Sequence, residues 1–266
     1  MKGPFTIIFR GHSGSRLLCE AFLQNDFWMG LCETKTRDAR EFGYRNHEVR
    51  RLIKAAFLYP EASPAEKARL QKRMRNLVQN SKNFCPNPAS KIAYGWKQAI
   101  TTFTIQIFLD AYPHAKAIHL IRDGRDVMLS RLGRISKMDD PLVRLMVFGD
   151  ANVTEYRGKP LTPEVVEEYR NEIELRHWVT VVRFGMRGRM YANQYMEVRY
   201  EELCHRPVET LGRVFEFLEV PFYQKTKEWV LSESSNQRIG KWKDYQQQSI
   251  EAVKIGEPLL QELGYL

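Results

Sequence analysis

The chain has 266 residues, of which 43% are hydrophobic and 12% are aromatic, enough to build a large buried core. Its formal net charge of +9 suits a highly anionic ligand, and it equally suits nucleic acid or an anionic membrane surface. The basic residues are dispersed without a recognisable nucleic-acid motif, and no apolar run approaches the length of a membrane span. We therefore expect one soluble enzyme domain at residues 1–266, with neither a nucleic-acid partner nor a membrane-spanning segment.

The first predicted element is a strand at residues 5–10, which leaves no room for a secretory signal ahead of it. The cysteines are scattered, with no C-x-x-C pair and no metal-ligand spacing: Cys19, Cys32, Cys85 and Cys204. These features predict a cytoplasmic location and thiols with structural or incidental roles.

A loop rich in Gly and Ser at residues 10–16 connects this strand to a helix predicted at 15–25. In a strand–loop–helix unit of this kind, backbone N–H groups can cradle a phosphate. The loop lacks the G-x-x-x-x-G-K-[ST] spacing and the lysine of ATPases, and a purely structural turn is the alternative interpretation. The candidate phosphate-binding residues are Arg10, Gly11, His12, Ser13, Gly14, Ser15 and Arg16.

Strands and helices continue to alternate after this loop. A short strand is predicted at 27–31, and a polar, largely helical stretch follows at 44–80. Within that stretch, Ser63 and Pro64 are typical of a helix cap followed by the first helical residue. The pattern then predicts a loop at 81–90, a strand at 91–96 and a helix at 99–112.

A second strand–turn–helix unit follows. The buried strand predicted at 116–121 ends abruptly at Arg122, and a helix is predicted at 124–132. Helix N-termini attract anions, so an arginine at the strand end and the hydroxyl of Ser130, two turns along the helix, could bind one phosphate. The alternative is an ordinary strand–helix junction with solvated charges. Two such units in one chain favour two different phosphates of a single nucleotide.

Gly and Pro interrupt residues 133–162, and regular elements resume beyond them. The pattern predicts a long helix at 163–186, a strand at 195–199, and helices at 207–218, 223–232 and 250–262. Alternating strands and helices predict an α/β fold, with a parallel sheet flanked by helices on both faces. Ligands of such sheets bind at the carboxyl ends of the strands, where both candidate phosphate loops fall.

Taken together, these motifs resemble sulfotransferases that use 3′-phosphoadenosine-5′-phosphosulfate (PAPS). The residues Ser13–Ser15 match the core of the family's first loop, commonly PRSGTT, which binds the 5′-phosphosulfate. Arg122 and Ser130 match the arginine, and the serine eight residues later, that bind the 3′-phosphate.

Two further segments carry the resemblance. VRYEEL, which contains Tyr200, and the RPVETLGRVFEFLEVPF that follows shortly after it are similar to the family's RYEDL segment, helix and FLGLP-like end, where the tyrosine lies near the adenine. RIGKW is similar to the basic loop that closes over the nucleotide, which implies donor contacts from Arg238, Lys241 and Trp242. The matches span roughly residues 5–245 and imply a P-loop-like sulfotransferase fold.

The first loop departs from the family pattern. His12 stands where the family has an arginine or lysine, Gly11 replaces the preceding proline, and Arg16 replaces the second threonine. A neutral imidazole donates one hydrogen bond and carries no fixed charge. Either Arg10 or Arg16 is a candidate for the missing cation.

The resemblance also implies catalytic residues. Glu33 lies 21 positions after His12 and is followed by threonine, as is the catalytic glutamate of the protein-tyrosine sulfotransferase branch. Lys97 lies 25 positions before Arg122 and matches a lysine of that branch that stabilises the leaving group. The alternatives are a surface acid at a strand end and a solvated lysine after a strand. His114 and His119 are weaker candidates for the base, and His119 is expected to be a sheet residue.

We therefore expect sulfuryl transfer from PAPS to a hydroxyl of a small molecule, sugar or lipid, with an amine as the second choice of acceptor. No metal is expected, since arginine, lysine and backbone N–H groups supply the positive charge. The acceptor site should involve residues 37–88 and 133–190, where aromatic residues either line the site or form core. The alternative functions are a P-loop kinase that uses ATP and a non-catalytic nucleotide-binding protein.

Overall fold

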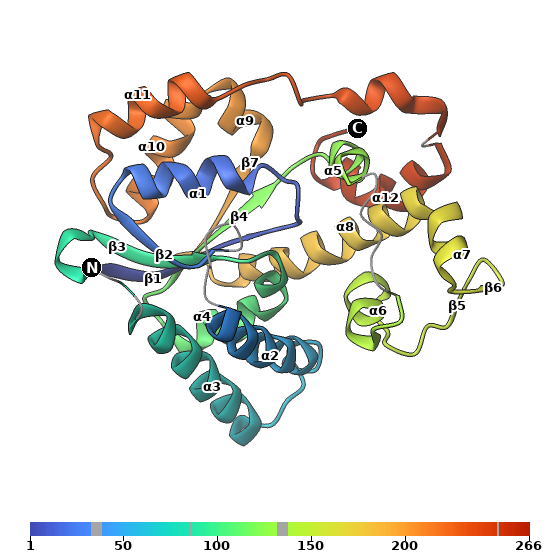
Figure 1. Cartoon of the computed structure of the whole chain (residues 1–266), viewed down its shortest axis with the longest axis horizontal. Helices are drawn as coiled ribbons and strands as arrows, with labels where there is room; N and C mark the ends of the chain where they lie inside the picture. The colour runs from blue at the N-terminus through green and yellow to red at the C-terminus, as the bar shows by residue number, and fades with distance from the viewer. Residues whose placement is uncertain (33–38, 84, 86, 132–137, 249) are drawn as a thin grey trace. The chain divides into compact units, whose positions relative to one another are not determined.

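The computed structural model of the chain describes residues 1–32, 39–83, 85, 87–131, 138–248 and 250–266 (Figure 1). These residues form two compact units. Unit 1 comprises Met1–Ile121 and Phe184–Asn236, and unit 2 comprises Arg122–Arg183 and Gln237–Leu266.

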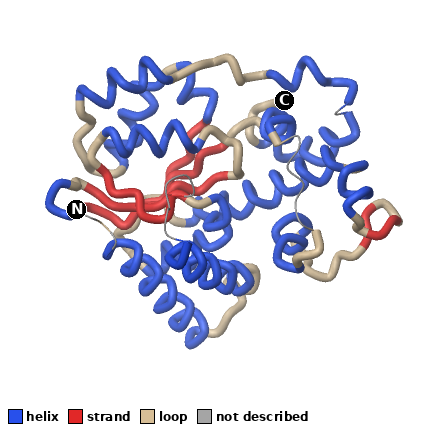
Figure 2. The backbone as a smooth tube through the Cα atoms, viewed as in Figure 1, coloured by secondary structure: helices blue, strands red, loops and turns tan. Residues whose placement is uncertain are grey.

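Unit 1 is built on a parallel sheet, seen as the red strands lying side by side in Figure 2. The sheet has five strands in the order β2-β3-β1-β4-β7. The register places Phe5 of the central strand β1 opposite Gly95 of β3 on one side and Lys116 of β4 on the other. Residues 4–9 of β1 and all of β3 are buried, as expected for parallel strands covered on both faces. The strands are β1 (Lys2–Phe9), β2 (Phe27–Cys32), β3 (Ala93–Lys97), β4 (Lys116–Ile121) and β7 (Tyr195–Arg199).

Helices cover both faces of this sheet (Figure 1). One face carries α1 (Ser15–Gln24), α9 (Tyr200–His205), α10 (Pro207–Phe217) and α11 (Gln224–Glu233). The other carries α2 (Ala39–Ala56), α3 (Pro64–Asn83) and α4 (Ile105–Ala111). Short 3-10 helices lie in the connections, at η1 (Pro88–Ser90), η2 (Ala99–Thr104) and η3 (Arg187–Met190).

Aromatic side chains fill the layer between the sheet and the first set of helices. The rings of Phe5, Phe22, Phe27 and Phe215 pack with centroids 5.0–5.7 Å apart, in edge-to-face and stacked pairs. These residues come from β1, α1, β2 and α10, so one cluster joins strands and helices that are far apart in the sequence.

Unit 2 is mainly helical and has its own small core. Met138, Val147, Tyr156, Val166 and Ile173 are buried together. Its elements are α5 (Gly124–Ser130), α6 (Pro141–Phe148), the two-residue strands β5 (Glu155–Tyr156) and β6 (Lys159–Pro160), α7 (Pro163–Glu168), α8 (Arg170–Met186), η4 (Lys241–Gln248) and α12 (Ile250–Glu262). The last three residues of α8 belong to unit 1.

The predicted fold class is confirmed: strands alternate with helices around a parallel sheet. The bounds of β4, β7 and α12 are those predicted, and α3 begins at Pro64 with the Glu66 N–H donating to Ser63 Oγ at 3.3 Å. The predicted helix at 163–186 is instead two helices with a break at Tyr169. No helix in the described ranges combines the length and the apolar character needed to cross a membrane.

The stretch at 133–162 contains a helix that the Gly and Pro pattern concealed. Helix α6 starts where Asp140 accepts the N–H of Leu142 at 2.9 Å with Pro141 at the first position, and it ends at Gly149, whose φ is 79°. Both are ordinary helix-end signals, but they enclose only eight residues, too few for the apolar period to stand out.

The side chain of one threonine forms hydrogen bonds with the backbone at the carboxyl end of β1. Thr102 Oγ1 accepts the N–H of Phe9 at 2.9 Å and lies 3.1 Å from the Phe9 carbonyl oxygen, to which it donates. Thr102→Val leaves both buried backbone groups without their partner, so we expect the free energy of unfolding to fall by about 2 kcal/mol or more in denaturant titrations.

Thr6→Val is the matched control, because the buried hydroxyl of Thr6 has no hydrogen-bond partner among the described residues. Its free energy of unfolding should stay unchanged or rise slightly. Equal losses in the two variants would contradict the role assigned to Thr102.

Candidate active site

The first candidate loop connects β1 to α1 in unit 1. The chain leaves the sheet after Phe9, and helix α1 begins at Ser15. Two residues of the loop have left-handed backbones, His12 with φ 73° and Gly14 with φ 81°. The turn is closed by the N–H of Ser13, which donates to the Arg10 carbonyl at 3.1 Å. The loop therefore turns tightly at the carboxyl end of the central strand.

This loop leaves the start of α1 open to an anion. Its N-cap residue, Gly14, offers no side chain to the first N–H groups, and the first turn contains no acidic residue. The hydroxyl of Ser13 is buried and has no hydrogen-bond partner within the described ranges. Uncapped N–H groups, the positive end of the helix dipole and an unpartnered hydroxyl are the groups that bind a phosphate or sulfate.

The cations around this loop lie in different environments. Arg10 is 5% exposed at the end of β1, whereas Arg16 is exposed in the first turn of α1. His12 is half-buried. Of the two arginines predicted to replace the family's loop cation, Arg16 is therefore the one on the surface.

A close contact with Tyr200 explains why position 14 is glycine. Tyr200 is the first residue of α9, directly after β7. A Cβ atom built on Gly14 would lie 2.1 Å from Tyr200 Cδ2, far inside van der Waals contact. The ring predicted to lie near the adenine thus packs directly against the loop predicted to bind the 5′-phosphosulfate.

Lys97 lies at the carboxyl end of β3, opposite Ile7 of β1 and Cys32 of β2. It is 4% exposed, and its Nζ lies 5.3 Å from the centroid of the Phe9 ring. No carboxylate of the described residues forms an ion pair with it. Glu33 lies outside the described residues, but it follows directly on Cys32, the residue paired with Lys97 in the sheet.

The structure confirms that His119 is a sheet residue. It is fully buried in β4, and its Nδ1 lies 2.6 Å from the hydroxyl of Tyr195, which donates to Glu197 at 2.9 Å. Burial lowers the pKa of His119 to about 3. A neutral imidazole enclosed in this way is poorly placed to take a proton from a substrate.

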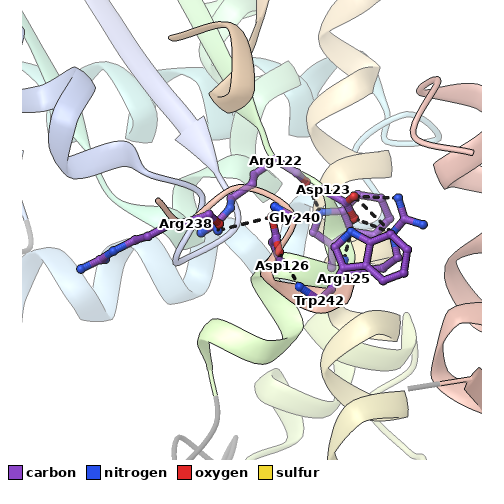
Figure 3. A network of polar contacts seen from close by, with 8 residues as sticks. Arg122, Asp123, Arg125, Asp126, Arg238, Gly240 and Trp242 are labelled. Atoms are coloured by element: carbon purple, nitrogen blue, oxygen red, sulfur yellow. Dashed lines mark hydrogen bonds and ion pairs between the residues drawn. The ribbon is translucent and has the colours of Figure 1, made fainter. Parts of the chain in front are cut away.

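The second candidate site lies in unit 2 (Figure 3). Arg122 is 4% exposed, and its Nη2 lies 3.6 Å from Asp126 Oδ2 and donates to the carbonyl oxygen of Arg238. The structure therefore brings together the strand-end arginine and the RIGKW loop, as the resemblance implies. Ser130 is the exposed last residue of α5.

The other loop residues differ in exposure. Arg238 and Lys241 are exposed, whereas Trp242 is half-buried. One face of the Trp242 ring is taken by the guanidinium of Arg125, whose Cζ lies 3.8 Å from the ring centroid. This cation–π contact gives Trp242 a structural partner in addition to its predicted contact with the donor.

The start of α5 differs from the expectation of a bare, anion-attracting helix end. The Asp123 carboxylate caps it by accepting the backbone N–H of Arg125 at 2.9 Å. It also accepts the Arg125 guanidinium, with Nη2 at 2.7 Å from Oδ2. The start of α5 is therefore already capped by a carboxylate, unlike the uncapped start of α1.

Sequence reasoning missed Asp126, whose carboxylate holds the RIGKW loop by accepting two of its backbone N–H groups. It also missed Trp178, which donates its Nε1–H to the Arg122 carbonyl at 3.1 Å and packs against Gly124. The spacing of Arg122 and Asp126, four residues apart at a helix start, is a detectable ion-pair signal. Nothing local to residue 178 points to Arg122.

The contact between Gly14 and Tyr200 leads to a prediction about Gly14→Ala. The new methyl group would overlap the Tyr200 ring, and the alanine would have to adopt the unfavourable left-handed φ of Gly14. Gly149→Ala is the matched control, since Gly149 has φ +79° but nothing within 4 Å of the new Cβ. We expect a loss of about 1–2 kcal/mol for the control and about 1–3 kcal/mol more for Gly14→Ala, measured by denaturant titration. Equal losses would show that Tyr200 does not constrain the loop.

The described part of the chain contains no cluster of three or more His, Cys, Asp or Glu placed to hold a metal ion. No functionally curated protein matches the sequence. Several solved structures are similar to this chain in fold. The sulfotransferase STF9 from Mycobacterium avium has a TM-score of 0.52 at 14% identity, over 98% of this chain and 76% of that one.

Two further solved structures are similar at lower scores. The sulfotransferase domain of the olefin synthase of Synechococcus PCC 7002 has a TM-score of 0.48 at 20% identity, over 90% of this chain and 81% of that one. A sulfotransferase from Alicyclobacillus acidocaldarius also scores 0.48, at 15% identity over 98% of this chain and 96% of that one. The model of the sulfotransferase family matches residues 11–224, most of the sequence. The chain belongs to the sulfotransferase family.

Proposed function

We propose that this protein transfers a sulfuryl group from PAPS to a hydroxyl group of a small molecule, sugar or lipid. The observation that carries the proposal is the set of anion-binding groups at the carboxyl edge of the unit 1 sheet. No side chain caps the start of α1, and within the described residues the buried Ser13 hydroxyl has no hydrogen-bond partner and the buried Lys97 has no carboxylate partner. Together with membership of the sulfotransferase family, these groups suit the phosphosulfate of the donor.

The donor contacts are assigned as follows. The loop at residues 10–16 would hold the 5′-phosphosulfate, with Ser13 and the N–H groups at the start of α1 as hydrogen-bond donors. Tyr200 would lie near the adenine. The 3′-phosphate would be held by Arg122 and Ser130, with Arg238, Lys241 and Trp242 of the loop over the nucleotide. We propose, as the resemblance implies, that residues 1–266 form a single sulfotransferase domain.

The chemistry requires a base and a cation. Bound PAPS supplies an activated sulfuryl group. Glu33 accepts the proton of the acceptor hydroxyl while the acceptor oxygen bonds to sulfur and the bond from sulfur to the bridging phosphate oxygen breaks. Lys97 offsets the negative charge that develops on that bridging oxygen, and 3′-phosphoadenosine-5′-phosphate (PAP) leaves.

The position of Lys97 supports this assignment. Lys97 is buried and forms no ion pair with a carboxylate of the described residues. Burying an ammonium group costs free energy, and an anionic group bound beside it offsets that cost. The register places Cys32, the last residue of β2, opposite Lys97, the last residue of β3. Glu33 follows Cys32 in the sequence and lies outside the described residues, so its role as the base rests on the resemblance. The enclosure of His119 argues against that histidine as the base.

The acceptor segments are proposed from the sequence. Five aromatic residues of the expected acceptor segments, three of them half-buried, have packing or hydrogen-bond partners within their own units. Phe57 stacks on Phe103 at 5.5 Å, and Tyr59 is 2% exposed and donates to Asp110 at 2.8 Å. Phe148, Tyr156 and Tyr169 pack together in unit 2. The side chains of Phe42 and Tyr44 lie outside those described, and we retain residues 37–88 and 133–190 as the proposed acceptor segments.

Donor recognition can be tested through the 3′-phosphate. We expect PAP to bind at least about tenfold more tightly than ADP in calorimetry, because one charge-assisted phosphate contact contributes about 1.5–3 kcal/mol. Arg122→Ala should abolish the difference while the circular dichroism spectrum stays native. Arg206→Ala, which removes the same charge from an exposed ion pair with Glu209, should keep the difference. Equal affinity of the wild-type protein for PAP and ADP would contradict the proposal and reopen the kinase alternative.

The catalytic roles can be tested by steady-state kinetics with PAPS once an acceptor is found. Glu33→Gln keeps the shape of the side chain and removes the base, so kcat should fall by about 10²–10⁴-fold with little change in PAP affinity. Lys97→Ala should also lower kcat, but by a smaller factor when an aryl sulfate, whose leaving group is already good, is used in the reverse direction. Lys91→Ala, just before β3, is the control and should behave as wild type. Tight PAP binding with no turnover on any hydroxyl acceptor would support a non-catalytic binding protein instead.

A further inference from the structure

The carboxylate of Asp126 joins two parts of unit 2 that are far apart in the sequence (Figure 3). Its Oδ2 accepts the N–H of Gly240 at 2.8 Å and its Oδ1 accepts the N–H of Trp242 at 3.1 Å. Oδ2 also lies 3.6 Å from Nη2 of Arg122. Asp126 is only 2% exposed, so these contacts form away from bulk water.

A second set of contacts holds the same loop independently of Asp126. The guanidinium of Arg125 stacks on the Trp242 ring, with Cζ 3.8 Å from the ring centroid. Arg125 is itself fixed by Asp123, with Nη2 2.7 Å from Oδ2, and by the carbonyl oxygen of Tyr265 at 2.7 Å. Two neighbouring residues of α5, Arg125 and Asp126, thus contact the loop at residues 240–242.

The hydrogen bonds of Asp126 are expected to stabilise the loop more than the stacking of Arg125 on Trp242 does. A buried carboxylate is tolerated only when it is paired and hydrogen-bonded, and charge-assisted hydrogen bonds are about twice as strong as neutral ones. Asp126 meets this condition with two backbone N–H groups and one guanidinium. If the carboxylate is removed, the N–H groups of Gly240 and Trp242 lose their acceptor, and Arg122 loses the charge that orients it.

We propose that Asp126 is a positioning residue for the donor nucleotide: it holds Arg122 and the loop at 238–242 in one arrangement before the nucleotide binds. The inference rests on the proposed function, because it is the donor that these two elements are assigned to contact. Asp126 and a phosphate are both negative, so Asp126 acts through the guanidinium and the loop and makes no contact with the donor itself. A binding site ordered in advance avoids the entropy cost of ordering on binding, which raises affinity.

The positioning role can be measured first without any ligand. Amide hydrogen exchange at Gly240 and Trp242 should be at least about tenfold faster in Asp126→Asn than in the wild type, because the loop opens more often. Amides of β1 and β4 in the same sample should exchange as in the wild type. Asp244→Asn makes the same charge change on an exposed residue of η4 and should leave the loop unchanged. Faster exchange everywhere would show general destabilisation, and unchanged exchange at Gly240 and Trp242 would overturn the inference.

The second measurement concerns the donor. Asp126→Asn should weaken PAP binding by about tenfold in calorimetry and raise KM for PAPS more than it lowers kcat, since the residue does not touch the reacting atoms. If Asp126→Asn does not fold, Arg125→Lys tests the loop from its other side, because lysine keeps the charge and loses the planar stack on Trp242. It should also weaken PAP binding, by a smaller factor.

The outcomes separate this inference from the proposed function. If the wild-type protein fails to distinguish PAP from ADP, the donor assignment is wrong. The hydrogen-exchange measurement then still shows whether Asp126 orders the loop at 238–242. If the wild-type protein binds PAP selectively and Asp126→Asn binds it equally well, the donor assignment survives and the positioning role of Asp126 is wrong.

Discussion

The parallel direction of the sheet is the constraint on which the candidate site in unit 1 depends. Because β1, β3 and β7 run the same way, their carboxyl ends lie at one edge of the sheet, and each end supplies a different part of the site. The end of β1 leads into the loop before α1, β3 ends in Lys97, and β7 leads directly into Tyr200. Thr102 fixes where β1 stops, since its hydroxyl satisfies both backbone groups of Phe9. The contact between Gly14 and Tyr200 then sets how closely the loop approaches the end of β7.

Buried cations in the two units differ in whether a described carboxylate pairs with them, and this difference agrees with the roles proposed for them. In unit 1, Lys97 is buried with no carboxylate among the described residues to balance it, so a bound anion would stabilise it. In unit 2, each of two buried arginines has a carboxylate partner: Asp126 for Arg122 and Asp123 for Arg125. Such paired arginines are held in fixed positions, as a recognition element requires. A cation with no carboxylate partner among the described residues suits the role proposed for Lys97, at the phosphosulfate end of the donor.

Much of this could be predicted from the sequence, because the informative signals were local. The patterns at 116–121 and 195–199 predicted two strands to the residue, and the Gly- and Ser-rich loop is the tight connection between β1 and α1. Its role as an anion site stays a prediction. Short elements such as α6 were missed because eight residues carry little periodic signal. The hydrogen bonds from Gly240 and Trp242 to Asp126 could not be predicted. The two residues lie 114 and 116 positions after Asp126, and the contacts depend on how the chain folds back. For the same reason, the sequence showed Trp242 as a possible donor contact and gave no sign of its stacking partner Arg125.

The most direct test of the account is a crystal structure of the protein with PAP. We expect the 5′-phosphate at the start of α1, within hydrogen-bonding distance of Ser13 Oγ, and the 3′-phosphate in contact with the guanidinium of Arg122 and the hydroxyl of Ser130. The Asp126 carboxylate should still accept the N–H groups of Gly240 and Trp242 in that complex. A nucleotide bound with its 3′-phosphate in solvent, or with its 5′-phosphate away from the loop at 10–16, would contradict the account.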